Sequence, residues 1–164
     1  MSILQVCEWL ESSSIGIVVR ESLWGFPMLV AIHILGITAS VGLLIWFDLR
    51  LLGAIMPAVP VATVYRGLAP WMLSGFSTMF VSGAVLFIAF ATKAYGNVYF
   101  QIKLAAMLLA GMNALIFHYA TERHIVEWNE SARLPVGARL AGAISIVAWT
   151  VVILAGRMMS YTMF

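Results

Sequence analysis

Residues 23–53 read LWGFPMLVAIHILGITASVGLLIWFDLRLLG. From Leu23 to Phe47 the only side chain that titrates near neutral pH is His33, and the apolar run ends at Asp48 and Arg50. Roughly 20 apolar residues, each rising about 1.5 Å in a helix, cross the hydrocarbon layer of a bilayer. This stretch therefore predicts a transmembrane helix with a titratable group inside the membrane.

The composition of the whole chain is that of a membrane protein. Its 164 residues are 63% hydrophobic and 10% charged, whereas soluble domains carry about 25% charged residues. The net charge of +2 is small, so we expect the lipid bilayer, and no nucleic acid, as a partner. Cys7 is the single cysteine, which excludes an internal disulfide and a metal site built from several thiolates.

Four long uncharged stretches predict four membrane spans, at about residues 23–47, 67–92, 99–121 and 139–157. Short connections favour an all-α, antiparallel up-down-up-down bundle, so we expect residues 1–164 to form a single membrane domain. Small residues such as Gly75, Ser82, Gly83 and Ser145 recur inside these spans. They are typical of helices that pack closely in a membrane.

The segments between the spans are short. Within residues 2–20 the pattern predicts one amphipathic helix in the membrane interface, anchored by Trp9 and ending at the serine run 12–14. Ser22 is a plausible cap for the first span. Residues 93–97 predict a tight turn, and residues 122–135, which carry several charges, predict a solvated extension and loop.

Both chain ends then lie on one side of the membrane, which we call side A. Its basic residues are Arg20, Lys93, Lys103 and Arg157. The opposite side, side B, carries Arg50, Arg66, Arg123, Arg133 and Arg139. The slight excess on side B favours a cytoplasmic position for that side.

The polar residues within the spans fall into two layers. Fifteen positions separate His33 from Asp48, and fifteen separate Lys103 from His118, which corresponds to about 22 Å along each helix. Because the first and third spans run in the same direction, His33 and Lys103 share a level near side A, with Arg157 at the nearby surface. The side-B level holds Asp48, Arg50 and His118, with Glu122 and Arg139 close to it.

This layering argues against a heme held between His33 and His118, because two axial imidazoles must lie at one level. A heme held by His33 with another second ligand, or with none, stays open. So does a purely structural histidine that hydrogen-bonds inside the bundle. Lys103 either extends to the interface or pairs with an acidic group such as a heme propionate. Asp48 and His118 form a structural pair, a proton entry or a second cofactor level.

The sequence resembles a domain-of-unknown-function group of small bacterial four-helix membrane proteins. The resemblance rests on His33-Ile-Leu-Gly36, Gly42 and Asp48-Leu-Arg-Leu-Leu-Gly53 in the first span, and on Phe100-Gln-Ile-Lys103, Asn113 and Phe117-His118 in the third. It covers most of the chain. It implies the four-helix membrane fold and carries no established activity.

A more distant resemblance is to the heme-binding membrane protoporphyrinogen oxidase and to the membrane domain of the copper-resistance D family. The likeness to the oxidase rests on His33, Arg50 and the aromatic-x-x-Lys of Phe100–Lys103, and the likeness to the copper-resistance D family rests on the histidine-then-glycine pattern of the first span. The oxidase pattern has a second histidine just after the arginine, where this chain has Leu52 and Gly53. What the resemblance implies is therefore limited to His33 as an axial ligand of a b-type heme, with Lys103 close by.

We therefore predict a multi-pass protein of the bacterial inner membrane that binds heme b near side A and acts in electron transfer or a membrane redox reaction. The predicted cofactor-binding residues are His33, Lys103 and Arg157, with His33 as the metal ligand. Asp48, Arg50 and His118 are predicted to form a structural polar clasp. One alternative is a non-catalytic subunit of a larger membrane complex or a homo-oligomer. Another is handling of copper or a small solute. The chain has no nucleophile triad, phosphate loop or zinc spacing.

Overall fold

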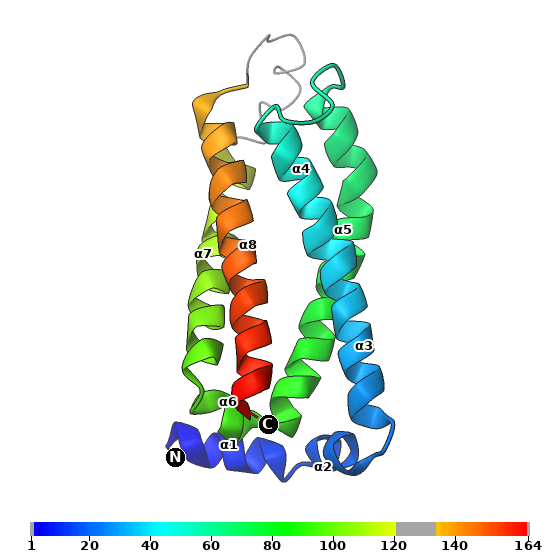
Figure 1. The fold of residues 1–164 in the computed structure, drawn as a ribbon, viewed down its shortest axis with the longest axis vertical. Helices are drawn as coiled ribbons and strands as arrows, with labels where there is room; N and C mark the ends of the chain where they lie inside the picture. The colour runs from blue at the N-terminus through cyan, green and yellow to red at the C-terminus, as the bar shows by residue number, and fades with distance from the viewer. Residues whose placement is uncertain (1, 121–133, 164) are drawn as a thin grey trace.

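Four helices in the structure are long and apolar enough to cross a membrane. The computed structural model describes residues 2–120 and 134–163, and the four helical stretches are Gly25–Leu51, Val61–Ala89, Val98–Tyr119 and Val136–Met163. They pack as an antiparallel bundle with both chain ends at the same end (Figure 1). The all-α, four-helix membrane fold predicted from the sequence is confirmed. Most of the predicted loop 122–135 lies outside the described residues.

Two short helices lie across the side-A end of the bundle (Figure 1). They are α1 (Ile3–Glu11) and α2 (Ser14–Glu21). The sequence predicted one helix that ended at residues 12–14, and the presence of α2 corrects this. The Ser13 hydroxyl accepts a hydrogen bond from the Gly16 N–H at 3.2 Å, so the serine run that ends α1 also caps the start of α2.

The first span consists of three helical segments in direct succession. They are α3 (Gly25–Ile37), the π-helical turn η1 (Thr38–Gly42) and α4 (Leu43–Leu51). The Ser22 hydroxyl accepts from the Gly25 N–H at 3.0 Å and so helps to start α3, as its predicted role as a cap requires. Within η1 the Ser40 hydroxyl donates to the Gly36 carbonyl oxygen at 2.7 Å. Such wide turns are rare and often occur near functional sites.

The remaining helices are α5 (Val61–Ala89), α6 (Ala91–Tyr95), α7 (Val98–Ala120) and α8 (Val136–Met163). The helix α6 replaces most of the turn predicted at residues 93–97. In addition, α5 begins before the predicted boundary at Gly67, and α8 continues past Arg157 to Met163. The membrane signal in the sequence marks only the uncharged part of a helix, whereas the helices themselves continue into the polar interface.

Glycine allows the first span to approach α5 closely. A Cβ atom on Gly75 of α5 would lie 2.5 Å from the backbone nitrogen of Ser40 in η1. One turn further along the contact, a Cβ on Gly36 would lie 2.8 Å from the backbone nitrogen of Met79. Both distances are too short for any real Cβ. The two backbones are therefore in direct contact, as is common where small residues line a membrane helix interface.

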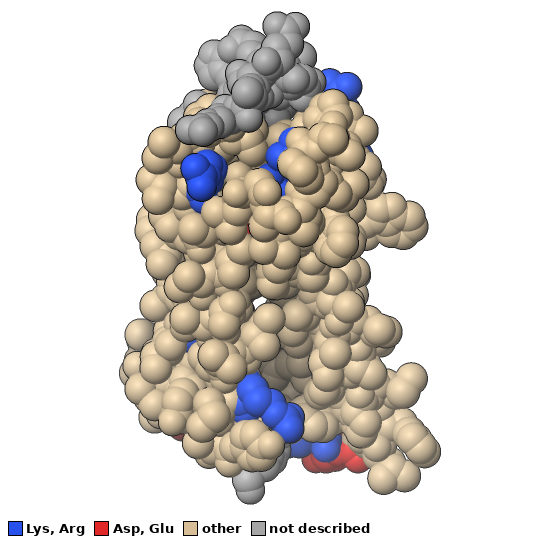
Figure 2. Space-filling model, turned by 45° about the horizontal axis from the view of Figure 1, so that its top comes forward, with Lys and Arg blue, Asp and Glu red and all other residues tan. Residues whose placement is uncertain are grey.

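The first two spans meet the last two through α4 and the middle of the bundle. At the side-B end, α4 crosses α8, where a Cβ on Gly142 would lie 3.1 Å from the Asp48 carbonyl oxygen. In the middle, the rings of Phe76 and Trp149 pack with centroids 5.3 Å apart. On the face drawn in Figure 2, Lys and Arg side chains lie toward the two ends of the molecule and leave a middle band without them. This distribution suits a protein embedded in a bilayer.

The contact between α5 and η1 gives a stability test. Gly75→Ala is expected to lower the free energy of unfolding by about 1–3 kcal/mol, because the new methyl group must push two packed backbones apart. The matched control is Gly67→Ala in the same helix, where a Cβ would meet no heavy atom within 4 Å. The measurement is thermal unfolding of each purified variant in detergent. Equal melting temperatures for both variants would contradict the close contact.

Candidate functional site

His33 faces α5 from the middle of α3 and is half-buried. Its Nδ1 atom lies 2.9 Å from the hydroxyl oxygen of Ser82, which is 2% exposed. The ring also interacts with the backbone of Met79, one helical turn before Ser82. The imidazole is thus oriented by groups that all belong to one turn of α5.

The hydrogen bonds of Ser82 bear on which ring nitrogen of His33 carries the proton. The Ser82 hydroxyl donates to the Thr78 carbonyl oxygen at 2.6 Å, with a longer contact of 3.2 Å to the Met79 carbonyl oxygen. A hydroxyl has one proton, and here it is directed to backbone carbonyls. This network favours the tautomer in which Nδ1 of His33 donates to Ser82 and Nε2 carries no hydrogen. A neutral imidazole in this tautomer is ready to bind a metal through Nε2.

Gly83 makes the room that the imidazole occupies. A Cβ on Gly83 would lie 3.1 Å from Cε1 of His33 and 3.6 Å from Nδ1. Any larger residue would press on the edge of the ring next to the Ser82 hydrogen bond. Ser82 and Gly83 were seen in the sequence only as small packing residues. Their role beside His33 depends on how α3 and α5 are rotated against each other, which the sequence alone does not give.

Lys103 reaches the same level from α7. It lies close enough to His33 for an electrostatic interaction between the two side chains. Its side chain also runs beside α8, where Nζ and Cδ would each lie 3.9 Å from a Cβ on Gly156. Within residues 2–120 and 134–163 no carboxylate forms an ion pair with this ammonium group. The structure therefore places Lys103 within electrostatic range of His33 and leaves the lysine charge without an acidic partner among the described residues.

Arg157 follows Gly156 on α8 but is directed elsewhere. Its side chain is exposed, its Nη2 donates to the Tyr161 hydroxyl at 3.0 Å, and its guanidinium lies 4.7 Å from the centre of the Tyr161 ring. This placement agrees with the position near the side-A surface that the sequence predicts for Arg157. In this conformation the guanidinium is held by Tyr161, so it is not part of the His33–Lys103 pair.

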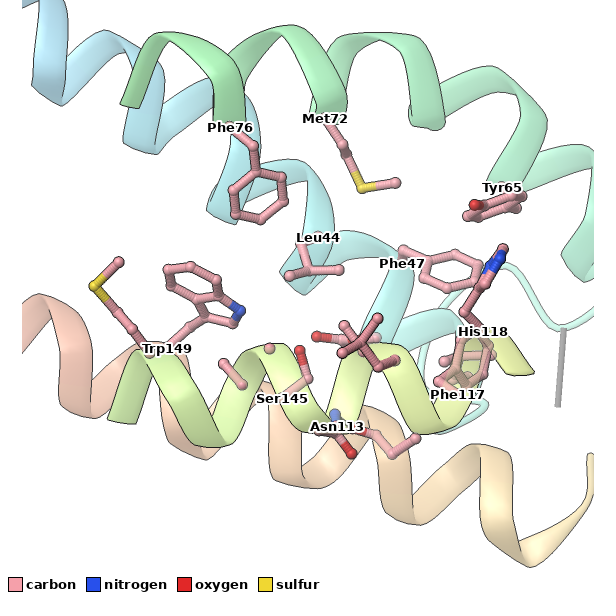
Figure 3. Close-up of a pocket in the computed structure, with 18 of the residues that line it drawn as sticks. Leu44, Phe47, Tyr65, Met72, Phe76, Asn113, Phe117, His118, Ser145 and Trp149 are labelled. Carbon is pink, nitrogen blue, oxygen red and sulfur yellow. Dashed lines mark hydrogen bonds between the residues drawn. The ribbon is translucent and has the colours of Figure 1, made fainter. Parts of the chain in front are cut away.

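A separate cavity of about 550 Å³ lies in the side-B half of the bundle. In Figure 3, Phe76 and Met72 project from α5 toward the side of Trp149 and Ser145, and Tyr65 lies beside Phe47 and His118. Asp48 of α4 and Asn113 and His118 of α7 also line it. The walls are mainly aromatic and aliphatic, with these few polar groups among them. Such a composition is typical of a site for a small organic molecule.

The predicted side-B group separates into two parts. Asp48 and His118 line this one cavity, but Arg50 points to the loop that joins α4 to α5. The Arg50 Nε and Nη2 atoms donate to the Val59 carbonyl oxygen at 2.9 and 2.6 Å, and Nη2 reaches the Pro57 carbonyl oxygen at 3.4 Å. Arg50 thus fastens the loop. Glu122, also placed at this level by the sequence, lies outside the described residues.

His33 and His118 lie at different levels of the bundle. Lys103 is beside His33, and α7 runs without a break from Val98 to Ala120. His118 is fifteen residues beyond Lys103, so it lies about 22 Å further along the axis of α7, toward the opposite side of the membrane. One metal ion cannot be ligated by both imidazoles in this arrangement. Within the described part of the chain, no cluster of three or more His, Cys, Asp or Glu side chains could hold a metal ion.

Comparison with known proteins identifies a family for the chain but assigns no activity. No curated protein and no solved structure matches the chain. A family model, described as a family of unknown function, matches residues 6–162, which is nearly the whole sequence and includes all four spans. The protein therefore belongs to this family, DUF6644.

Proposed function

We propose that this protein binds heme b in the bacterial inner membrane, with Nε2 of His33 as an axial ligand, and that it acts in electron transfer or a membrane redox reaction. The observation that carries the proposal is the hydrogen-bond network of His33, Ser82 and Thr78, which favours one tautomer of the imidazole. In that tautomer the Ser82 hydroxyl gives its own proton to Thr78 and accepts from Nδ1, so Nε2 is left as a lone-pair donor inside the membrane. An imidazole held by a hydrogen bond on its other nitrogen is the usual form of a heme ligand.

The surroundings of His33 fit such a group in two further respects. Lys103 offers an ammonium group that has no acidic partner among the described residues, and it would neutralise a propionate. Gly83 leaves space at the edge of the imidazole, so the ring can keep its orientation. When bound, heme would supply one-electron chemistry at its iron, while the protein sets its ligand, burial and electrostatic environment. Arg157 would have to leave Tyr161 to reach a second propionate.

The first test removes the ligand. His33→Ala is expected to abolish heme binding, because it removes the imidazole whose Nε2 is free. The matched control is His118→Ala on α7, which should keep the wild-type heme content. The measurement is the ratio of heme to protein, from the Soret absorbance and the pyridine hemochrome of protein purified from cells supplied with heme. Full heme content in the His33 variant would overturn the assignment of the ligand.

The second test weakens the orientation of the ring. Ser82→Ala removes the acceptor for the Nδ1 hydrogen and is expected to lower heme affinity by about tenfold or more. Ser77→Ala is the control, because Ser77 lies on the same helix, is exposed and bonds only to the Leu73 carbonyl oxygen. Heme titration of the apoprotein in detergent measures both affinities. Equal affinities would show that the hydrogen bond is irrelevant to the ligand.

The third test concerns the charge of Lys103. Lys103→Gln is expected to lower the reduction potential of the bound heme, since a nearby positive charge favours the reduced iron. Lys93→Gln is the control, because Lys93 is exposed on α6. A spectroelectrochemical titration compares the two variants with the wild type. A potential that does not change in Lys103→Gln would place the heme away from this lysine.

Two other results would favour the alternative functions. Copurification of larger membrane proteins with a chain that shows no cofactor absorption would favour a non-catalytic subunit. Stoichiometric copper without heme, measured by metal analysis of the purified protein, would favour metal handling. Each result would also contradict the heme proposal.

A further inference from the structure

The side-B cavity contains a buried carboxyl group with one oxygen that lacks a hydrogen-bond partner. Asp48 is 3% exposed and lines the cavity. The Ser145 side chain hydrogen-bonds to this carboxyl group, whereas the second oxygen, Oδ2, is buried and has no hydrogen-bond partner in the described structure. A buried polar atom without a partner is costly, and a buried charge without a counter-charge is costlier still. Such an atom beside a cavity points to a ligand that completes it.

The nearby basic residues do not supply the missing partner. Arg50 is two positions along the same helix, but its guanidinium is directed to the Val59 and Pro57 carbonyl oxygens. Within residues 2–120 and 134–163 no basic side chain forms an ion pair with Asp48. Lys103 lies at the other level of the bundle, beside His33. His118 lines the same cavity, yet Oδ2 of Asp48 has no hydrogen-bond partner among the described residues, which leaves this oxygen available to a cation bound in the cavity.

The walls of the cavity suit an organic cation. Aromatic rings line it on several sides, among them Phe76 and Trp149, whose centroids are 5.3 Å apart. The face of an aromatic ring attracts a positive charge, and the attraction increases where water is excluded. A volume of about 550 Å³ is large enough for a small aromatic or alkyl molecule. A bare metal ion would lack the oxygen and nitrogen ligands it needs, since most of the lining is apolar.

The cavity also reaches the outside of the bundle at membrane depth. Phe80 and Leu115 line it, yet they are 53% and 57% exposed. Phe80 lies well inside α5, whereas Leu115 lies in the last turns of α7. The outer surface at Phe80 faces the apolar part of the bilayer. A ligand that dissolves in lipid could therefore enter sideways without passing through water.

We propose that this cavity is a binding site for a small lipophilic amine, whose ammonium group pairs with the Asp48 carboxylate while its apolar part packs on the aromatic walls. The site is separate from His33 and Lys103. Binding of an amine in this cavity does not depend on heme binding at His33. The amine proposal and the heme proposal can therefore be refuted separately.

The test uses two probes of nearly the same shape. They are 1-naphthylmethylamine, which is a cation at neutral pH, and 1-naphthalenemethanol, which is neutral. The full chain is reconstituted in nanodiscs of phosphatidylcholine, and binding is measured by isothermal titration against empty nanodiscs. The amine is expected to bind saturably at one site per chain, and at least about tenfold more tightly than the alcohol, because only the amine pairs with a buried carboxylate.

The variant Asp48→Asn keeps the size of the side chain and removes its charge. It is expected to weaken binding of the amine by about 30-fold or more and to leave the alcohol almost unaffected. The control is Glu8→Gln, an exposed acid on α1, which should not change either affinity. Equal binding of the amine to wild type and Asp48→Asn would overturn the proposal. Should Asp48→Asn fail to fold, equal affinity of wild type for amine and alcohol, or no saturable binding, would overturn it independently.

Discussion

The direct backbone contact between the first span and α5 is the constraint on which the rest of the structure depends. Ser40 packs on Gly75, Gly36 on Met79, and His33 reaches Ser82 and Gly83. As the residue number in the first span decreases, the residue number of its contact in α5 increases, as an antiparallel pair of helices requires. Because the two backbones touch at the glycines, α3 cannot shift sideways against α5. The contact therefore fixes both the depth of α3 in the membrane and its rotation about its own axis. It therefore decides which residues surround the imidazole.

The two polar levels follow from this contact and from the uninterrupted course of α7 from Val98 to Ala120. The level near side A combines a histidine whose Nδ1 contacts the Ser82 hydroxyl and a lysine without an acidic partner among the described residues. The level near side B combines a carboxyl group lacking one partner with aromatic walls. The level near side A suits the proposed ligand, an anionic group that carries a metal ion. The level near side B suits a cationic ligand. One small bundle can thus keep two sites of opposite electrostatic preference apart by distance along its axis.

The sequence predicts the helices and the level of each charge well, but not their lateral neighbours. The fixed rise of a helix places Lys103 beside His33 and keeps His118 away from it, because counting residues is enough. To predict that His33 pairs with Ser82, one must know how α3 and α5 are rotated about their axes. That rotation is determined by helix packing and is not given by residue spacing. The helix α2 was missed because Ser13 both follows one helix and caps the next. The side-B cavity arises from side chains of four helices that do not fill the space between them, and no spacing in the chain reveals such a void.

The measurement that tests the central claim most directly is the optical spectrum of the wild-type protein, purified in mild detergent from membranes of cells supplied with heme. A free Nε2 at His33, oriented by Ser82, predicts a Soret band in the oxidised protein and the α and β bands of a b-type heme after reduction. The predicted heme content is one per chain. A spectrum that shows only the absorption of the aromatic residues, even after heme is added to the purified protein, would contradict the account.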